Sequence, residues 1–310
     1  MKQTPQVLVF HSHGVGQYVR VHAFPEPGET IRAISWDNDR DGGKGSNVAI
    51  ALGKLGIPTA FFGKLGNDIW AEMGLNWMQS FGVNVELVLL SEQIHTSTGL
   101  VMIDDQGENY IVTMNTGTSF TEAEIAAALD ASQSCTHFIT GFEIPVDNAL
   151  TGARLAHAMG MMTILNPSPV PAEDLGALPY IDLMIVNRVE GQKLSGLPCE
   201  EDPQKLLAAL KKRYQMGAVI MTMGPKGSYG YDGAQFWHNP VFDLPVVDTT
   251  GAGDAFLACV VAELTQGAGL PQACAVASAY SSLAVTKLGT FPAYPTRAEL
   301  HTFLQKHAID

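Results

Sequence analysis

Short apolar segments alternate with segments of helical periodicity along most of the chain. The apolar segments are four to six residues long, which is typical of strands buried on both faces. They are residues 6–10, 58–62, 137–140, 161–165, 181–186 and 218–222. Helical patterns occupy residues 47–55, 69–81, 121–131, 147–159, 203–215 and 255–264. This alternation predicts an α/β fold with a doubly wound, mainly parallel sheet that helices cover on both faces.

Other segments alternate polar and apolar residues with a period of two, at positions 17–23, 29–35, 99–103 and 109–114. Strands of this kind have one buried and one solvated face, so they predict a small antiparallel sheet, a lid beside the main sheet. No internal repeat, low-complexity tract or long linker interrupts the chain. We therefore expect residues 1–310 to form one domain, with lid strands inserted at about 17–37 and 98–115.

Composition narrows the classes of partner. The chain has 18 basic and 31 acidic residues and a net charge of −13, which argues against binding nucleic acid through a broad basic face. Its four cysteines are widely spaced and include no CxxC, so neither a disulfide framework nor a zinc site is expected. No run approaches the ~18 apolar residues of a membrane-spanning helix, and the N-terminus does not resemble a signal peptide. These features predict a soluble, cytoplasmic protein that does not bind membranes.

Residues 248–254, DTTGAGD, carry the strongest chemical signal, because they open the apolar helix predicted at 255–264. Small residues at a helix N-terminus let backbone N–H groups approach an anion, and the helix dipole favours negative charge there. A carboxylate at this point suits phosphate chemistry only as the reacting base. Asp254 is then positioned to accept a proton from a hydroxyl. The alternative is a tight turn with Asp254 as an ordinary helix-end carboxylate.

Three weaker motifs also lie at the ends of predicted elements. Residues 42–47, GGKGSN, open a helix without forming a Walker A loop, and their Lys44 and Asn47 suit a polyol. Residues 187–190, NRVE, follow a strand and suit magnesium water or phosphate oxygens, or else a simple helix cap. Residues 222–227, TMGPKG, let the backbone approach a nucleotide, or else form a β-turn.

Together these motifs, in this order, make the chain resemble the ribokinase-like (PfkB) family of small-molecule kinases. The resemblance covers nearly the whole chain, and DTTGAGD is its most specific part. Further segments lie where ribokinases have their counterparts: 24–30 (FPEPGET), 66–68 (GND), 166–169 (NPSP) and 284–289 (AVTKLG).

The resemblance implies phosphorylation of an alcohol by ATP, with Asp254 as the base. It assigns the anion hole to the backbone amides of Gly251, Ala252 and Gly253. It assigns the nucleotide site to Asn187, Thr222, Gly224, Gly227 and Ser278. Glu190 would organise Mg²⁺ through water, and a K⁺ loop would comprise Asp248, Thr250, Ala284, Lys287 and Gly289. The sugar would be held by Gly43, Lys44, Asn47 and Glu143. Because family members often pair their lids, a homodimer is expected.

One departure from the family pattern concerns the loop after the first strand. Ribokinases carry Gly-x-x-Asn-x-Asp there, and the Asn and Asp hold sugar hydroxyls; here His11 takes the place of the first Gly, and Gly14 and Gly16 replace the Asn and Asp. Each hydroxyl left buried without a partner costs about 1–3 kcal/mol, so plain ribose is expected to be a poor substrate. Gly16→Asp is expected to move preference toward ribose unless Gly16 has a positive φ.

Two explanations for the departure remain open. Either a different substrate fills the space over Gly14 and Gly16, or neighbouring side chains supply the acceptors. The candidates for that second role are His11, His13, Gln17 and Asn38.

The hypotheses are a kinase for a non-standard sugar, a nucleoside or modified-sugar kinase, and a ligand-binding protein on a kinase scaffold that has lost turnover. The intact DTTGAGD argues against the last of these, whereas Gly14 and Gly16 argue for testing it. ATP consumption across a panel of sugars and nucleosides, compared with binding alone, separates them.

Overall fold

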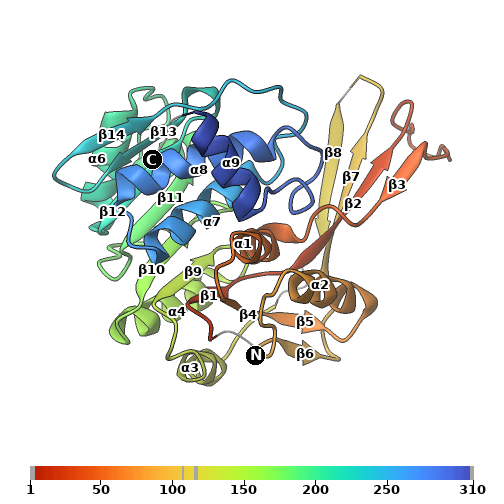
Figure 1. Cartoon of the computed structure of the whole chain (residues 1–310). Helices are drawn as coiled ribbons and strands as arrows, with labels where there is room; N and C mark the ends of the chain where they lie inside the picture. The colour runs from red at the N-terminus through yellow and green to blue at the C-terminus, as the bar shows by residue number, and fades with distance from the viewer. Residues whose placement is uncertain (1–3, 107, 115–117, 308–310) are drawn as a thin grey trace.

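The central sheet is the frame on which the site is built (Figure 1). In the computed structural model, which describes residues 4–106, 108–114 and 118–307, it has eight strands in the order β14-β13-β12-β11-β10-β9-β1-β4. The strands from β12 to β4 run parallel, whereas β13 and β14 form an antiparallel hairpin at one edge. The bounds are β1 Val7–Phe10, β4 Thr59–Phe62, β9 His137–Gly141, β10 Met162–Asn166, β11 Leu183–Asn187, β12 Ala218–Thr222, β13 Ser228–Tyr231 and β14 Phe236–Asn239. The predicted mainly parallel sheet is confirmed.

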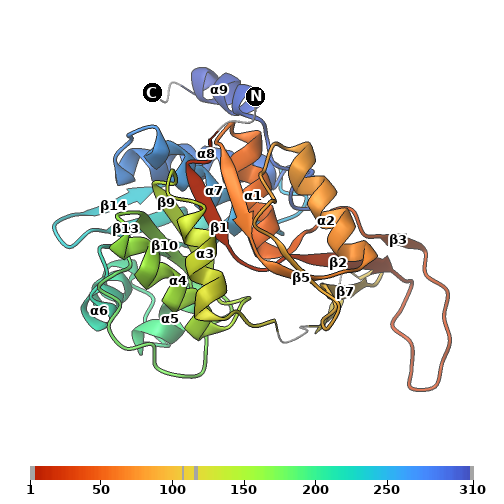
Figure 2. The ribbon, with the colours of Figure 1, turned by 90° about the horizontal axis from the view of Figure 1, so that it is seen from below.

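Helices cover both faces of this sheet (Figure 2). Along β1, Val7 and Val9 join one buried cluster while Leu8 and Phe10 join the other, because side chains alternate between the faces of a strand. The first cluster is packed by α1 Gly43–Lys54, α2 Ile69–Ser80, α7 Ala252–Thr265, α8 Leu270–Ala284 and α9 Arg297–Lys306. The second is packed by α3 Glu122–Asp130, α4 Val146–Ala158, α5 Arg188–Ser195 and α6 Pro203–Tyr214.

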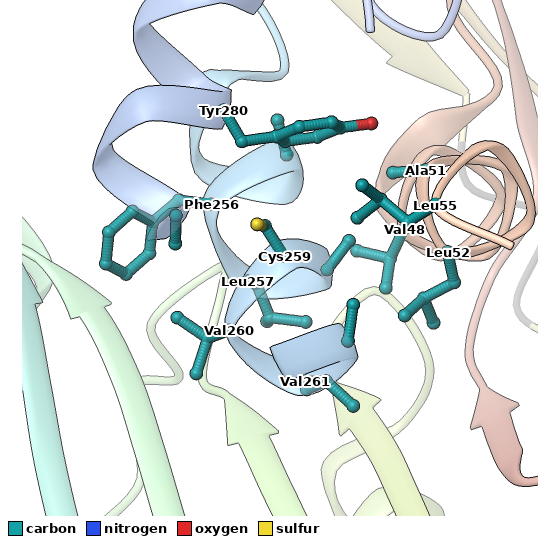
Figure 3. Packing of buried hydrophobic residues seen from close by; sticks show 14 of the residues in the cluster. Val48, Ala51, Leu52, Leu55, Phe256, Leu257, Cys259, Val260, Val261 and Tyr280 are labelled. Carbon is teal, nitrogen blue, oxygen red and sulfur yellow. The ribbon is translucent and has the colours of Figure 1, made fainter. Parts of the chain in front are cut away.

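Helices α1 and α7 pack against each other through buried side chains (Figure 3). Val48 and Leu52 of α1 meet Leu257 and Val261 of α7 in one buried cluster. Cys259 is also fully buried there, as expected of a packing residue. The packing fixes the GGKGSN and DTTGAGD segments relative to one another.

A second sheet projects from the main body and forms the lid, in the order β3-β2-β7-β8 (Figure 1). Its strands are β2 Gly14–Arg20, β3 Ser35–Asp37, β7 Ser97–Ile103 and β8 Asn109–Met114. The pairings are antiparallel except between β2 and β7, which are parallel. The predicted lid limit at residue 115 lies outside the described residues.

One lid strand was predicted too early. The strand expected at 29–35 forms only at β3, and residues 24–34 are irregular. Residues 33–36 are all exposed, so the polar–apolar alternation there does not correspond to a strand with one buried face. Pro25, Pro27 and Gly28, whose φ is 89°, also favour a loop after β2.

Two smaller features complete the fold. Strands β5 Lys64–Gly66 and β6 Leu89–Ser91 form a parallel pair. Within the described part of the chain, no helix combines the length and apolar character needed to cross a membrane.

Candidate active site

The polar motifs converge at one end of the main sheet, where the parallel strands end and the N-termini of α1 and α7 lie. This is the edge at which open α/β sheets bind ligands. Side-chain contacts join segments far apart in the sequence: Lys44 Nζ lies 3.8 Å from Asp254 Oδ1, and the Lys44 backbone N–H donates to Glu143 Oε2 at 3.1 Å. The structure therefore brings the predicted base and three of the predicted sugar-binding residues, Gly43, Lys44 and Glu143, into one site.

The N-terminus of α7 has the shape that the small residues predict. Gly251 caps the helix at φ 72°, and a Cβ there would lie 2.5 Å from the Tyr294 hydroxyl, which donates to the Gly251 carbonyl. At Gly253 a Cβ would meet no atom within 4 Å, so the first turn of the helix is open. The Ala252 N–H donates to the Thr249 carbonyl at 3.2 Å, so the backbone N–H groups of Gly251 and Gly253 are the better placed of the three to face an anion.

Asp254 lies in that first turn with only 8% of its surface exposed. Burial raises the pKa of its carboxyl group, and the Lys44 ammonium and a hydrogen bond from Asn47 partly oppose this rise. The pKa of Lys44 is raised in turn, and the Asp254 carboxylate is the main cause. A carboxylate whose pKa is raised holds a proton more tightly than an ordinary exposed one, so it is the stronger base.

Asn47 links this carboxylate to the rest of the site. Its Nδ2 donates to Asp254 Oδ2 and to Asp41 Oδ1, both at 3.0 Å. Its Oδ1 accepts from the Gly42 N–H at 3.1 Å and the Thr290 hydroxyl at 2.8 Å. The amide thus uses both of its N–H groups inside the protein, which is the geometry of a residue that positions the base.

Glu143 closes the opposite side of the site. The Ser12 hydroxyl donates to its Oε2 at 2.5 Å, and burial raises the pKa of its carboxyl group. Gly43 has a φ of 73°, and a Cβ there would lie 3.2 Å from the Gly14 nitrogen. The backbone turn at residues 42–43 therefore approaches β2 closely.

The structure bears on three of the candidate acceptors near Gly14 and Gly16, namely His11, His13 and Gln17. His13 Nδ1 is 2.8 Å from the Ser46 hydroxyl and Nε2 is 3.3 Å from the Trp70 carbonyl, so both ring nitrogens have protein partners. His11 accepts from the Ser12 N–H at 2.9 Å through Nδ1. Gln17 faces away from the side of β2 that carries Gly14 and Gly16, because neighbouring strand residues point to opposite faces.

Asp41 is the site residue that sequence analysis missed. Its Oδ2 lies 2.9 Å from the position of a Cβ on Gly16, and its backbone carbonyl accepts from the Gly16 N–H at 3.0 Å. The available signal was its place directly before GGKGSN, where a carboxylate enters the N-terminal end of a helix.

A cavity of about 550 Å³ lies on the other side of α7. Thr222, Gly224, Gly227 and Ser278 line it, together with Gly253 next to the base. This volume is in the range of small-ligand pockets. Asn187 is not among its lining residues; it pairs with Thr222 at the strand ends, and its side chain caps α5.

Sequence comparison gives the family. The model of the pfkB family of carbohydrate kinases matches residues 16–297. The chain belongs to the pfkB family. It is therefore a phosphotransferase of the sugar-kinase type, with a hydroxyl group as acceptor.

Similar proteins match between 94% and 98% of this pfkB kinase. The bifunctional ribokinase/ribose-5-phosphate isomerase A of Fructilactobacillus sanfranciscensis is 30% identical over 94% of this chain, which spans 55% of that protein. The deoxyribokinase of Salmonella typhi is 28% identical over 96% of this chain and 98% of its own. The solved Arabidopsis thaliana ribokinase complexed with ribose and ATP superposes with a TM-score of 0.87 at 26% identity, covering 98% of this chain and 99% of that one.

The predicted magnesium residue of the pfkB kinase has a structural role that uses one of its oxygens. Glu190 Oε2 accepts from the Asn187 N–H at 2.8 Å in a capping box. Its charge nevertheless raises the pKa of both Lys44 and Asp254, so it faces the site. The described residues include no cluster of three or more His, Cys, Asp or Glu side chains suited to a metal.

The predicted K⁺ loop is assembled around Asp248. Its Oδ1 accepts from the Thr250 N–H and hydroxyl at 2.9 and 2.7 Å, and its Oδ2 accepts from the Gly289 N–H at 3.0 Å. The Asp248 N–H also reaches the carbonyl of Val285, beside Ala284. The Lys287 N–H donates to the Ala284 carbonyl, so these segments form one loop cluster next to the N-terminus of α7.

Proposed function

We propose that this pfkB kinase transfers the γ-phosphoryl group of ATP to a hydroxyl group of a sugar-like small molecule. The observation that carries the proposal is the position of Asp254, between a cavity of nucleotide size and a pocket of polar side chains. The full-length likeness to a ribokinase complexed with ribose and ATP supports both halves of this assignment.

In this proposal the Asp254 carboxylate accepts the proton of the substrate hydroxyl as that oxygen attacks phosphorus. The new O–P bond forms while the bond from phosphorus to the β,γ-bridging oxygen of ATP breaks, and ADP leaves with that electron pair. The amides of Gly251, Ala252 and Gly253 and the positive end of α7 stabilise charge on the transferring group. Lys44, 3.8 Å from Asp254, adds a positive charge. ATP supplies the phosphoryl group, and the protein supplies position and electrostatics.

Two ions belong to the proposal. Mg²⁺ would neutralise phosphate charge, with Glu190 holding one of its waters. K⁺ would bind to the Asp248–Gly289 loop cluster, where backbone carbonyls and Asp248 provide oxygen ligands. Because this cluster adjoins the N-terminus of α7, occupancy would reinforce the anion hole.

We also propose a homodimer formed through the lid. Alternate residues of β8, Tyr110, Val112 and Met114, are exposed, and Trp36 of β3 is 60% exposed. Strands with apolar exposed faces at a sheet edge are usually covered in natural proteins. The four cysteines are all unpaired, which supports a reducing compartment such as the cytoplasm.

The test is phosphoryl transfer from ATP to a panel of sugars and nucleosides, with binding measured separately by calorimetry. Asp254→Asn is expected to lower turnover by about 10²–10⁴-fold and to leave ADP binding intact. The control is Asp130→Asn, an exposed carboxylate at the end of α3. Binding of acceptors without any turnover in the wild type would favour a ligand-binding protein on a kinase scaffold, and preference for a nucleoside would favour a nucleoside kinase.

A further inference from the structure

The side chain of Asp41 occupies the volume over Gly16. A Cβ built on Gly16 would lie 2.9 Å from Asp41 Oδ2 and 3.0 Å from Asp41 Cβ. Gly16 does not have a positive φ, so its backbone does not itself require glycine. The missing side chain at this position of β2 is therefore matched by a carboxylate that enters the same space from the loop before α1.

The two oxygens of this carboxylate have different partners. Oδ1 accepts from Asn47 Nδ2 at 3.0 Å and from the Gly43 N–H at 3.1 Å. Among the described residues, Oδ2 accepts one long hydrogen bond, from the Tyr18 hydroxyl at 3.4 Å. Asp41 is also only half-buried, so Oδ2 keeps acceptor capacity on its open side.

Asp41 is held close to the base. The same Asn47 Nδ2 lies 3.0 Å from Asp41 Oδ1 and 3.0 Å from Asp254 Oδ2. Both carboxyl groups therefore lie within hydrogen-bond distance of one amide nitrogen, so a polyol bound at Asp254 lies close to Asp41. Asp41 also adjoins the turn formed by Gly42 and Gly43, which faces Gly14.

We propose that Asp41 is the acceptor that binds a substrate hydroxyl in this kinase, in place of a side chain at Gly16. The inference rests on the proposed function and names the residue that determines its specificity. Because the carboxylate reaches the pocket from the α1 side rather than from β2, it presents its oxygens in a different direction. The favoured substrate therefore differs from plain ribose in the hydroxyl that meets Asp41.

Asp41→Asn changes this contact with little change of shape. Two N–H donors hold the Oδ1 position, so the amide oxygen takes that place and the NH₂ group replaces Oδ2. The hydrogen-bond acceptor at the Oδ2 position is thereby replaced by a hydrogen-bond donor. We expect the KM of the best acceptor on a panel of D-ribose, 2-deoxy-D-ribose, D-fructose and adenosine to rise about 10–100-fold, with ADP affinity unchanged. The control is Asp39→Asn, the same charge change at an exposed position.

Gly16→Ala tests the same idea without changing a charge. The methyl group would lie 2.9 Å from Asp41 Oδ2 and must displace it, so a similar rise in KM is expected. The matched control is Gly99→Ala, because Gly99 pairs with Gly16 across β2 and β7 and a Cβ there meets nothing within 4 Å. This pair also keeps the test valid should Asp41→Asn fail to fold.

The outcomes separate the two proposals. A rise in KM for both Asp41→Asn and Gly16→Ala, with both controls unchanged, supports the role of Asp41. Unchanged KM, or a fall in kcat alone with a shifted pH profile, overturns it and leaves the kinase function standing, because Asp41 would then act only on the base through Asn47. If the wild type phosphorylates no member of the panel, calorimetry of the same compounds with ADP present decides: weaker binding by Asp41→Asn supports the contact, equal binding overturns it, and no binding by the wild type overturns both proposals.

Discussion

Acid is expected to destabilise this protein through two buried histidines next to the site. His11 and His13 come directly after β1 in the chain, and only 3% and 2% of their surfaces are exposed. Burial lowers the pKa of His11 to about 3 and that of His13 to about 4, from 6.5. The unfolded chain therefore binds more protons than the folded chain between about pH 4 and pH 6.5. Stability that is fully present above pH 6.5 is lost as the pH falls toward these lowered values.

The loss of stability depends on how far the pH lies below the pKa of the histidines in the unfolded chain. Each pH unit below the unfolded pKa costs about 1.4 kcal/mol per histidine until the folded pKa is reached. At pH 5 this amounts to about 2 kcal/mol for each of the two residues. Asp254 and Glu143 act in the opposite direction, because burial raises the pKa of both carboxyl groups. The informative quantity is therefore the difference between variants rather than the total change.

The assay is urea unfolding at pH 7 and pH 5. His13→Gln is expected to lose less free energy of unfolding than the wild type between these pH values, by about 2 kcal/mol. Its own destabilisation at pH 7 does not matter, because only the pH dependence is compared. His301→Gln, on the exposed surface of α9, should show the wild-type dependence. Equal losses in the wild type and His13→Gln would refute the reasoning and restore His13 as a solvent-accessible candidate ligand.

Further predictions concern the network, the ions, the assembly and the substrate. Asn47→Ala removes the amide that donates to Asp41 and Asp254 and accepts from Thr290. The free energy of unfolding, measured in urea, should therefore fall by about 2–4 kcal/mol. The exposed control Asn67→Ala should lower it by less than about 0.5 kcal/mol. Replacing K⁺ by tetramethylammonium at constant ionic strength should lower turnover, and chelation of Mg²⁺ should abolish it; no change would count against the ion sites. Light scattering at micromolar concentration should give twice 33.2 kDa, and a monomer mass contradicts the lid dimer. D-Ribose should be phosphorylated less efficiently than the best acceptor, and a kcat/KM for ribose near ~10⁴ M⁻¹s⁻¹ would contradict this.

The structure changes the expected effect of Gly16→Asp. The obstacle is not a positive φ but the Asp41 carboxylate, which already fills the space. Two carboxylates in one volume repel each other, so the single substitution should weaken substrate binding rather than restore ribose recognition. Sequence analysis missed this because the contact joins β2 to the loop before α1, and no local pattern reports it.

Some elements escaped prediction for physical reasons. The β13–β14 hairpin lies at the edge of the sheet. The buried positions of β13 are Ser228 and Gly230, and β14 has only exposed and half-buried residues, so the hairpin has little apolar signal. Strand β3 is only three residues long and begins at Ser35, further along the chain than the alternation at 29–35 indicated. The helix cap at Asn187, by contrast, was readable because both of its partners lie within one helical turn.

The sequence by itself determined what depends on neighbours along the chain: the alternation of buried strands and helices around the parallel strands, the small residues that begin the helix at Gly251–Asp254 and the family. Apolar periodicity and glycine placement act over a few residues, so they can be interpreted without a structure. Only the tertiary structure decided which side chains share the site. Asn47 and Asp254 are 207 positions apart, and the packing of α1 against α7 brings them into hydrogen-bond contact. The tertiary structure also places Asp41 over Gly16 and buries His13 against α2, where a Cβ on Gly74 would leave no room for the ring.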